Sequence, residues 1–308
     1  MEGVRYATSL ADKLGAAVAL VHVIEPAPRF SGMDQVVLAQ SDAEVVEQAE
    51  RQLARVAKRQ SKKGCVVRSF VRHGKSFHEI AALAGSREVD LIVIATRGHT
   101  GLKRILLGST AERVVRHAPC PVLTVPSRSA DARVSEAPSF RLKKIVVPID
   151  FSQTSAQALP YAAALAERFG AEIILLHVIA PVPLPLPFYV RRKLQESAGR
   201  VAKLAMDVKL SRLCEEAFDD EMHSRTLVRA GVPSDEITKA ARSQRADLII
   251  LTTHGYTGLK HALLGSTAER VVRNVTGPVL VVRKMPPSSR FSADAKSGSS
   301  QALGLTVR

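Results

Sequence analysis

A glycine-punctuated segment that could bind phosphate occurs twice in this sequence of 308 residues. Residues 101–116 and 258–273 are identical at fourteen of sixteen positions, so the chain contains two copies of one unit. Each segment includes Gly-Ser-Thr where a helix is predicted to begin. Backbone N–H groups at the start of a helix commonly bind phosphate, and the serine and threonine could alternatively serve only as helix caps. The chemistry that this segment favours is binding of a phosphorylated ligand.

A carboxylate accompanies this segment in the second copy. Residues 145–149 are predicted to form a buried strand, and Asp150 follows its carboxyl end. In open parallel α/β sheets, ligands bind at the carboxyl ends of strands, where the strand order reverses. Asp150 could contact such a ligand, or it could cap the turn after the strand.

The sequence shows no recognisable catalytic apparatus. It contains no nucleophile paired with a base, no paired acids at a cleft signature and no Walker lysine motif. His22 and His177 lie between apolar neighbours on predicted strands, and we interpret them as core or strand-end histidines. The three cysteines have no metal-ligand spacing, so no metal site is predicted. These residues favour a binding protein over an enzyme.

The elements that would position these residues alternate between short apolar runs and amphipathic helical stretches. This pattern predicts a parallel sheet covered by helices on both faces. Strands are predicted at 18–24, 66–71, 90–95 and 122–125 in the first copy, and at 145–149, 172–179, 225–229, 247–252 and 279–283 in the second.

The first copy is incomplete, because Met1 aligns with Ala156 and residues 143–155 have no counterpart. It therefore lacks the first strand and the acid at its end. We expect the strands at 18–24 and 90–95 to lose their shared partner, which would leave backbone groups unpaired and the first site incompetent. A start codon upstream of Met1 would supply the missing strand.

The predicted domains are 1–126, N-terminally truncated, and 141–284, complete. Residues 127–140 form a linker, and residues 285–308, rich in Ser, Ala and Gly, are predicted to be a disordered tail.

The net charge of +15 is partly local, since residues 51–75 hold nine Lys or Arg and no acid. On a helix, these cations form a solvated face, and a polyanion site is the alternative interpretation. No RNA-binding motif is present, so no specific nucleic acid is expected. The cations at helical spacing are Arg51, Arg55, Lys58, Arg59 and Lys62.

The longest apolar runs are strand-sized, and no signal peptide shows. A cytoplasmic protein without a transmembrane segment is therefore predicted.

Taken together, the sequence resembles the universal stress protein family in its tandem two-domain form. The signature of its nucleotide-binding members is Gly, two residues, Gly, nine residues, Gly and then Ser or Thr. The copies read Ala95-x2-Gly98-x9-Gly108-Ser109 and Thr252-x2-Gly255-x9-Gly265-Ser266, so the first glycine is replaced in both. The Val146–Ser152 run also looks like the family's first strand.

The resemblance implies two flavodoxin-like domains of the adenine nucleotide alpha hydrolase type, with strand order 3-2-1-4-5 and the first domain lacking its first strand. It implies ATP, with Mg²⁺, at the carboxyl ends of strands one and four. The implied contacts in the second copy are Pro148, Asp150, Val178, Thr252, His254, Gly255, Gly265, Ser266 and Thr267. The first copy keeps a degenerate site of Ala95, Gly98, Gly108, Ser109 and Thr110.

The function that the resemblance implies is stress signalling or protection, exerted by binding ATP and partners. Family members pair through the last strand, which predicts an internal pseudo-dimer of 122–125 with 279–282 or a homodimer. Two alternatives remain open: a non-nucleotide interaction and dimerisation module, and a slow ATPase.

Overall fold

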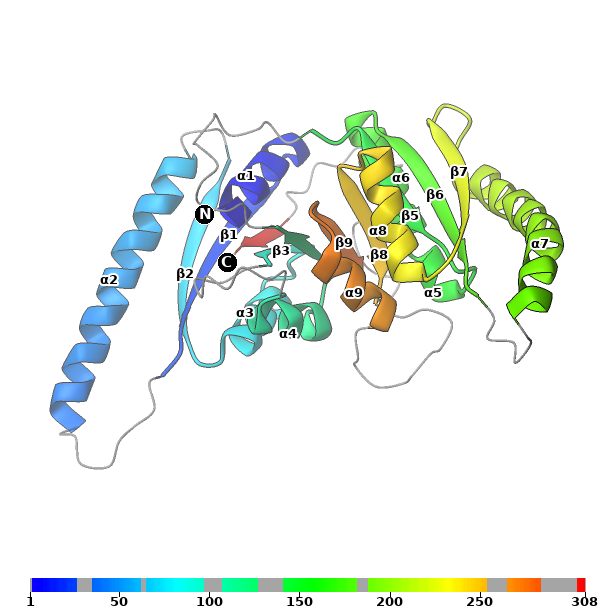
Figure 1. Cartoon of the computed structure of the whole chain (residues 1–308). Coiled ribbons are helices and arrows are strands. Elements are labelled where there is room, and N and C mark those ends of the chain that lie inside the picture. Colours follow the sequence, from blue (N-terminus) through cyan, green and yellow to red (C-terminus); the bar gives the residue numbers. More distant parts are fainter. Residues whose placement is uncertain are drawn as a thin grey trace. The chain divides into compact units, whose positions relative to one another are not determined.

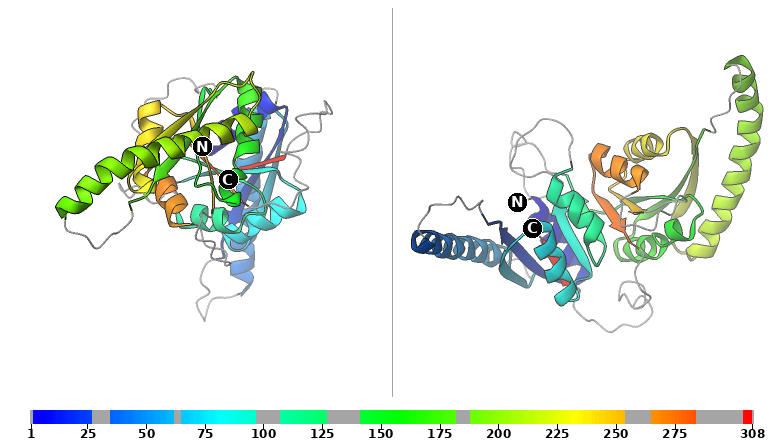
Figure 2. Two further views of the ribbon diagram at one scale, coloured as in Figure 1. Left: turned by 90° about the vertical axis from the view of Figure 1, so that its right-hand side faces the viewer. Right: turned by 90° about the horizontal axis from the view of Figure 1, so that it is seen from below.

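The chain, described by a computed structural model, folds into two compact units. The structure describes residues 2–26, 35–61, 65–96, 107–126, 141–181, 188–253, 265–283 and 304–307. Unit 1 comprises Met1–Phe140 together with Pro287–Arg308, and unit 2 comprises Arg141–Pro286. Each unit is built on a parallel sheet with helices against it (Figures 1 and 2), which confirms the predicted α/β class.

Unit 2 has the complete five-stranded arrangement. Its strands are parallel in the order β7-β6-β5-β8-β9, which is the expected order 3-2-1-4-5. The elements are β5 (Lys144–Pro148), α5 (Gln153–Ala156), α6 (Leu159–Phe169), β6 (Glu172–Ile179), α7 (Phe188–Ala217), β7 (Ser224–Ala230), α8 (Pro233–Gln244), β8 (Leu248–Thr252), α9 (Ser266–Asn274) and β9 (Val279–Val282).

The core of unit 2 lies on both faces of β5. Ile145, Val146 and Val147 are fully buried, because α6 packs against β5 and β6 from one face and α8 from the other. A strand covered on both faces reads as a continuous apolar run, without the alternation of a half-exposed strand. This is why β5 could be located from sequence.

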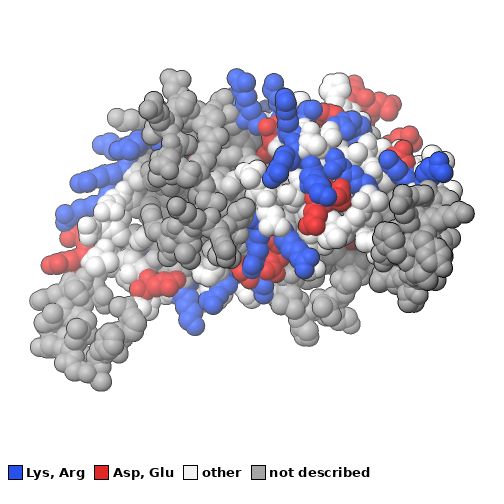
Figure 3. Space-filling view, in the orientation of Figure 1, with Lys and Arg blue, Asp and Glu red and all other residues white. Residues whose placement is uncertain are grey.

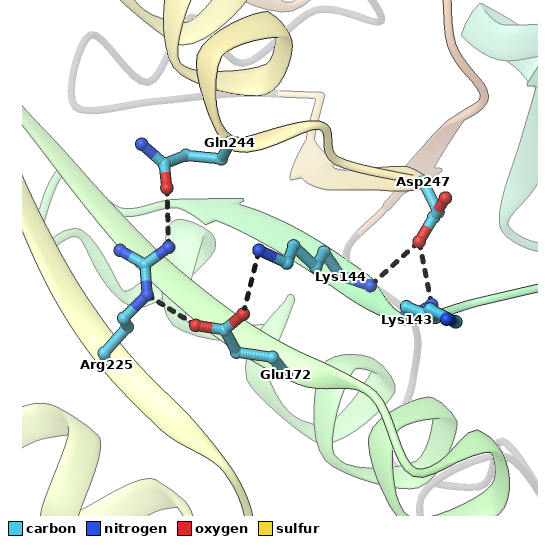
Figure 4. A network of polar contacts seen from close by, with 6 residues as sticks. All are labelled: Lys143, Lys144, Glu172, Arg225, Gln244 and Asp247. Atoms are coloured by element: carbon cyan, nitrogen blue, oxygen red, sulfur yellow. Dashed lines mark hydrogen bonds and ion pairs between the residues drawn. The ribbon is translucent and has the colours of Figure 1, made fainter.

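A polar network holds the amino-terminal edge of this sheet (Figure 4). Glu172 on β6 accepts a hydrogen bond from Nε of Arg225 on β7, and Nζ of Lys144 lies 3.5 Å from its second oxygen. Burial raises the pKa of Glu172, but the hydrogen bond and charge of Arg225, with Lys144, outweigh burial and lower it. Asp247 accepts the N–H groups of residues 143 and 144 at 2.8 and 3.0 Å, which fixes the start of β5.

Unit 1 repeats this plan with one change. Its strand order is β2-β1-β10-β3-β4, and within the described residues no strand precedes α1. Its elements are α1 (Glu2–Leu14), β1 (Ala17–Ile24), α2 (Gln35–Ser61), β2 (Val67–His73), α3 (Ser76–Ser86), β3 (Leu91–Ala95), α4 (Ser109–His117), β4 (Val122–Val125) and β10 (Gly304–Val307).

Strand β10 corrects two expectations. Residues 285–308 were expected to be disordered, but Gly304–Val307 form a strand that pairs in parallel with β1 and with β3. These two strands therefore keep a shared partner (Figure 1, red). A gap in a buried parallel sheet would leave N–H and C=O groups unpaired at about 1–3 kcal/mol each, which favours ordering a short β-forming segment there. Residues 284–303 and 308 lie outside the described residues.

Candidate functional site

The predicted site residues of unit 2 gather at the carboxyl-terminal edge of its sheet. Strand β5 lies between β6 and β8, so Asp150 follows the central strand, with Val178 on one neighbour and Thr252 at the end of the other. Pro148 is the last residue of β5. The strand order of unit 2 therefore brings together residues from three separate stretches of the sequence. Each of these four residues is half-buried.

The carboxylate of Asp150 is held by the turn that follows it. Its Oδ1 accepts hydrogen bonds from the backbone N–H of Ser152 at 3.0 Å and from the Ser152 hydroxyl at 2.6 Å. The Ser152 oxygen in turn accepts the N–H of Ser155 and caps α5. Asp150 thus has the turn-capping role considered from sequence, and this role gives its carboxylate a defined orientation.

Phe151, between these polar residues, adopts a left-handed backbone conformation with φ 62°. Such a conformation is strained for a bulky residue and is found most often at functional sites. Its ring lies 4.7 Å from that of His177, and Nζ of Lys209 on α7 lies 4.2 Å from its centre. Nδ1 of His177 donates to the carbonyl oxygen of Ile149 at 2.7 Å, which joins β6 to the end of β5.

Sequence reasoning missed the roles of Phe151 and Lys209. Phe151 stood next to Asp150 in a motif already singled out, so its position was available as a signal. Lys209 is one of many cations in the chain, and nothing in its spacing distinguishes it.

The helix after the duplicated loop begins beside the end of β8. Gly265 is its N-cap, and the N–H of Gly265 donates to the carbonyl oxygen of Thr253 at 2.6 Å. The N-cap glycine has no side chain that could cap α9, and Ser266 and Thr267 occupy the first two positions of the helix, the former exposed. The alternative in which these hydroxyls cap the helix is therefore wrong, because the chain passes through the cap position at a glycine. His254 and Gly255 lie outside the described residues.

The first copy has the same helix start without the acid. Gly108 caps α4 with φ −60° and ψ 142°, close to the −58° and 143° of Gly265, and its N–H donates to Thr96 O at 2.8 Å. Ser109 and Thr110 follow it, Ala95 ends β3, and Gly98 lies outside the described residues. No described residue stands in the place of Asp150, since β10 ends at Val307.

The two equivalent histidines differ accordingly. His177 is half-buried against Ile149 and Phe151, as expected for a strand-end histidine. His22 on β1 is exposed, because the described part of unit 1 has no counterpart of the turn after β5. The expectation of a packed histidine therefore holds in unit 2 alone.

The cysteines are free and buried. Burial, with a contribution from the charge of Asp90, raises the pKa of Cys120 to about 12. Among the described residues, no three His, Cys, Asp or Glu side chains could together hold a metal ion. No helix of that part of the chain is long and apolar enough to cross a membrane.

The predicted cationic face is present on α2. Arg51, Arg55, Lys58 and Arg59 are exposed, and basic side chains follow this helix at the left of Figure 3. Arg51 pairs with Glu47 one turn earlier. This surface is compatible with either interpretation made from sequence, a solvated face or a polyanion site.

The two units together define a tandem α/β protein with a helix N-terminus beside the carboxyl ends of parallel strands in each unit. Comparison with known sequences gives the family. Residues 1–126 and 141–283 match the sequence model of the universal stress protein family, and the chain belongs to that family.

Relatives cover one or both units. A universal stress protein of Mycolicibacterium smegmatis is 30% identical over 286 residues, which span 91% of this chain and 92% of the relative. One from Methanocaldococcus jannaschii is 38% identical over 152 residues, or 46% of this chain and 82% of the relative. The solved structure of a universal stress protein from Archaeoglobus fulgidus matches 92% of both chains with a TM-score of 0.62 at 21% identity, which supports the fold.

Proposed function

We propose that unit 2 binds ATP with Mg²⁺ at the carboxyl ends of β5 and β8, and that the protein acts in a stress response by nucleotide-dependent binding of partners. Membership of the universal stress protein family supports the stress-response role. The observation that carries the nucleotide proposal is that an oriented acid, Asp150, follows β5, while α9 begins at a glycine N-cap after the adjacent strand β8.

The start of α9 suits the phosphates. Its N-cap residue is a glycine, so no N-cap side chain or Cβ stands between the backbone and a ligand, and the helix dipole places partial positive charge there. Exposed Ser266 adds a hydroxyl donor. Mg²⁺ would be held mainly by the phosphate oxygens of the nucleotide and by water, with at most one or two carboxylates of the protein.

The opposite side of the site suits the base. The carboxylate of Asp150 can accept a hydrogen bond from an exocyclic amine, and Val178 on β6 places backbone groups next to it. The aromatic ring of Phe151 contacts His177 on β6 and Lys209 on α7. Together these groups would read the adenine end while α9 holds the phosphates.

Equilibrium dialysis with ATP and Mg²⁺ tests the proposal. We expect one saturable site per chain, weakened by about ten-fold or more in Gly265→Val, because a branched side chain then stands between the helix N-terminus and the phosphates. The matched control is Gly108→Val, the same change at the same backbone angles in unit 1, which should leave the affinity unchanged. No saturable binding at millimolar ATP would refute the nucleotide proposal.

The alternatives make different predictions. A non-nucleotide interaction module would show no ATP binding in any variant. A slow ATPase would release phosphate above background, and this release would disappear in Gly265→Val. Equal release by that variant would indicate a contaminating enzyme.

We also propose that the last strands of the units, β4 and β9, associate as an internal pseudo-dimer. Support comes from their short sequences, Val-Leu-Thr-Val and Val-Leu-Val-Val, each of which is the last strand at one edge of its own unit's sheet. An apolar edge strand is protected when another strand or element covers it. Leu123→Lys, which adds charge to β4, should loosen the chain in small-angle scattering, and an unchanged radius of gyration would contradict the proposal.

A further inference from the structure

Strand β10 lies in the middle of the unit 1 sheet, paired on both sides. Gly304 to Val307 are in register with Ala17 to Leu20 of β1. On the other side, Leu305 to Val307 are in register with Leu91 to Val93 of β3. Gly304–Val307 thus contribute a central strand to a unit from which they are separated in sequence by the whole of unit 2.

Strand β10 pairs with its two neighbours in unit 1 in the same register in which β5 pairs with its neighbours in unit 2. In unit 2, Lys144 pairs with Glu172, and Glu172 corresponds to Ala17, the partner of Gly304. On the other flank, Ile145 pairs with Leu248, which corresponds to Leu91, the partner of Leu305. Both flanks independently assign Gly304–Val307 to the positions of Lys144–Val147.

The slot between β1 and β3 is built as an interior position. Val18 and Leu20 on β1, and Ile92 and Val93 on β3, are each at most 1% exposed. Helix α1 contacts β1, β10 and β3, so it covers the slot as well as its neighbours. Asp90 stands at the position of Asp247, the acid that receives the N–H groups at the start of β5 in unit 2.

We propose that unit 1 is a strand-acceptor domain whose ligand is the chain's own segment around Gly304–Val307. Recognition is by main-chain hydrogen bonds on both edges of the inserted strand, the mode by which sheets accept peptides. Unit 1 therefore binds a peptide strand at the central position that in unit 2 leads to Asp150. Its integrity depends on a segment that follows unit 2, which links the two units a second time.

Disulfide trapping tests the occupant and the register. Ala19 and Thr306 are paired, and adjacent strands are about 4.8 Å apart, within the range that a disulfide spans. Oxidised Ala19→Cys/Thr306→Cys protein should form an intrachain bond, located by mass spectrometry. The control Val18→Cys/Thr306→Cys places its first cysteine on the opposite face of the sheet and should not react.

Other outcomes of the trapping overturn the proposal. Covalent dimers would show that the slot takes the strand of a second copy. An absent bond, or equal reaction of both cysteine pairs, would show that Thr306 does not lie beside Ala19.

A second experiment tests whether unit 1 opens when the pairing of β10 is disrupted. Thr306→Pro removes a backbone N–H from a strand with neighbours on both sides, whereas Thr306→Val keeps it and serves as the control. Cys65 and Cys120 report on unit 1 and Cys214 on unit 2, since all three are buried.

In pulsed thiol labelling, Cys65 and Cys120 should react about ten-fold faster or more in the proline variant than in the valine control, because local opening of unit 1 exposes them. Cys214 should react at the same rate in both variants. Unchanged labelling of the unit 1 cysteines, or equal acceleration at Cys214, would contradict a role of β10 in unit 1.

Discussion

The Nδ1 atom of His177 lies 2.7 Å from the carbonyl oxygen of Ile149, so the last residue before Asp150 is tied to the neighbouring strand. The same histidine packs against Phe151, the residue after Asp150. The side chain of His177 therefore contacts both chain neighbours of Asp150. These contacts explain how a turn with a strained phenylalanine is held at the edge of the sheet.

Replacing this histidine should destabilise unit 2. His177→Ala removes a hydrogen bond and a ring contact, and we expect a loss of about 1–2 kcal/mol in the free energy of unfolding, measured with urea. His22→Ala is the matched control, because His22 has the same place on β1 but is exposed. Equal losses in the two variants would show that the contacts of His177 contribute nothing.

The bend after β7 requires a glycine. Gly231 has φ 146°, and a Cβ there would lie 2.9 Å from Cγ of Glu236. Gly231→Ala should therefore cost about 1–3 kcal/mol through backbone strain and displacement of that side chain. Gly199→Ala on α7 has open space and should be neutral or stabilising by up to about 1 kcal/mol. Calorimetric melting temperatures would compare them, and a tolerated Gly231→Ala would contradict the strain.

Helix α8 ends at a residue that glycine would suit better. Arg245 has φ 53° and is exposed at its C-cap, while Gly170 occupies the corresponding position of α6 with φ 63°. Arg245→Gly should stabilise unit 2 by about 0.5–1 kcal/mol, because only glycine adopts this conformation without a steric penalty. Gly170→Ala should destabilise it by about 1 kcal/mol. Shifts of the same sign in urea midpoints would refute this account.

Acid should weaken the network around Glu172. The pKa of Glu172 is lower in the folded protein, so its contribution is complete above the ordinary carboxyl range near about pH 4.3. The contribution is lost as the pH falls through the lower folded value. Between pH 7 and pH 3, the free energy of unfolding should fall further in the wild type than in Glu172→Gln. The expected difference is only up to about 1 kcal/mol, because the ion pairs of Glu172 are partly exposed.

A control separates this network from general charge effects. Glu167→Gln removes one acid from the exposed part of α6. That variant should keep the acid sensitivity of the wild type. Identical pH profiles for the wild type and Glu172→Gln would contradict a stabilising role of the network.

Much of unit 2 could be predicted from sequence, because its signals are local. The apolar run 145–149 and the glycine at 170 mark elements wherever they fold. The strand order that the family resemblance implies then places Asp150 next to Thr252. The contact of Lys209 with Phe151 could not be predicted, because it depends on how α7 lies against the sheet and not on spacing.

The sequence by itself determined the duplication and the α/β class, and its family resemblance implied the strand order of the complete unit. Only the tertiary structure decided that Gly304–Val307 lie between β1 and β3, in the place that β5 has in unit 2. Four residues in a polar, Ser- and Gly-rich tail carry almost no periodicity, so composition predicts disorder. Their position depends on the unpaired edges of β1 and β3, which become neighbours of the tail only after the chain has folded.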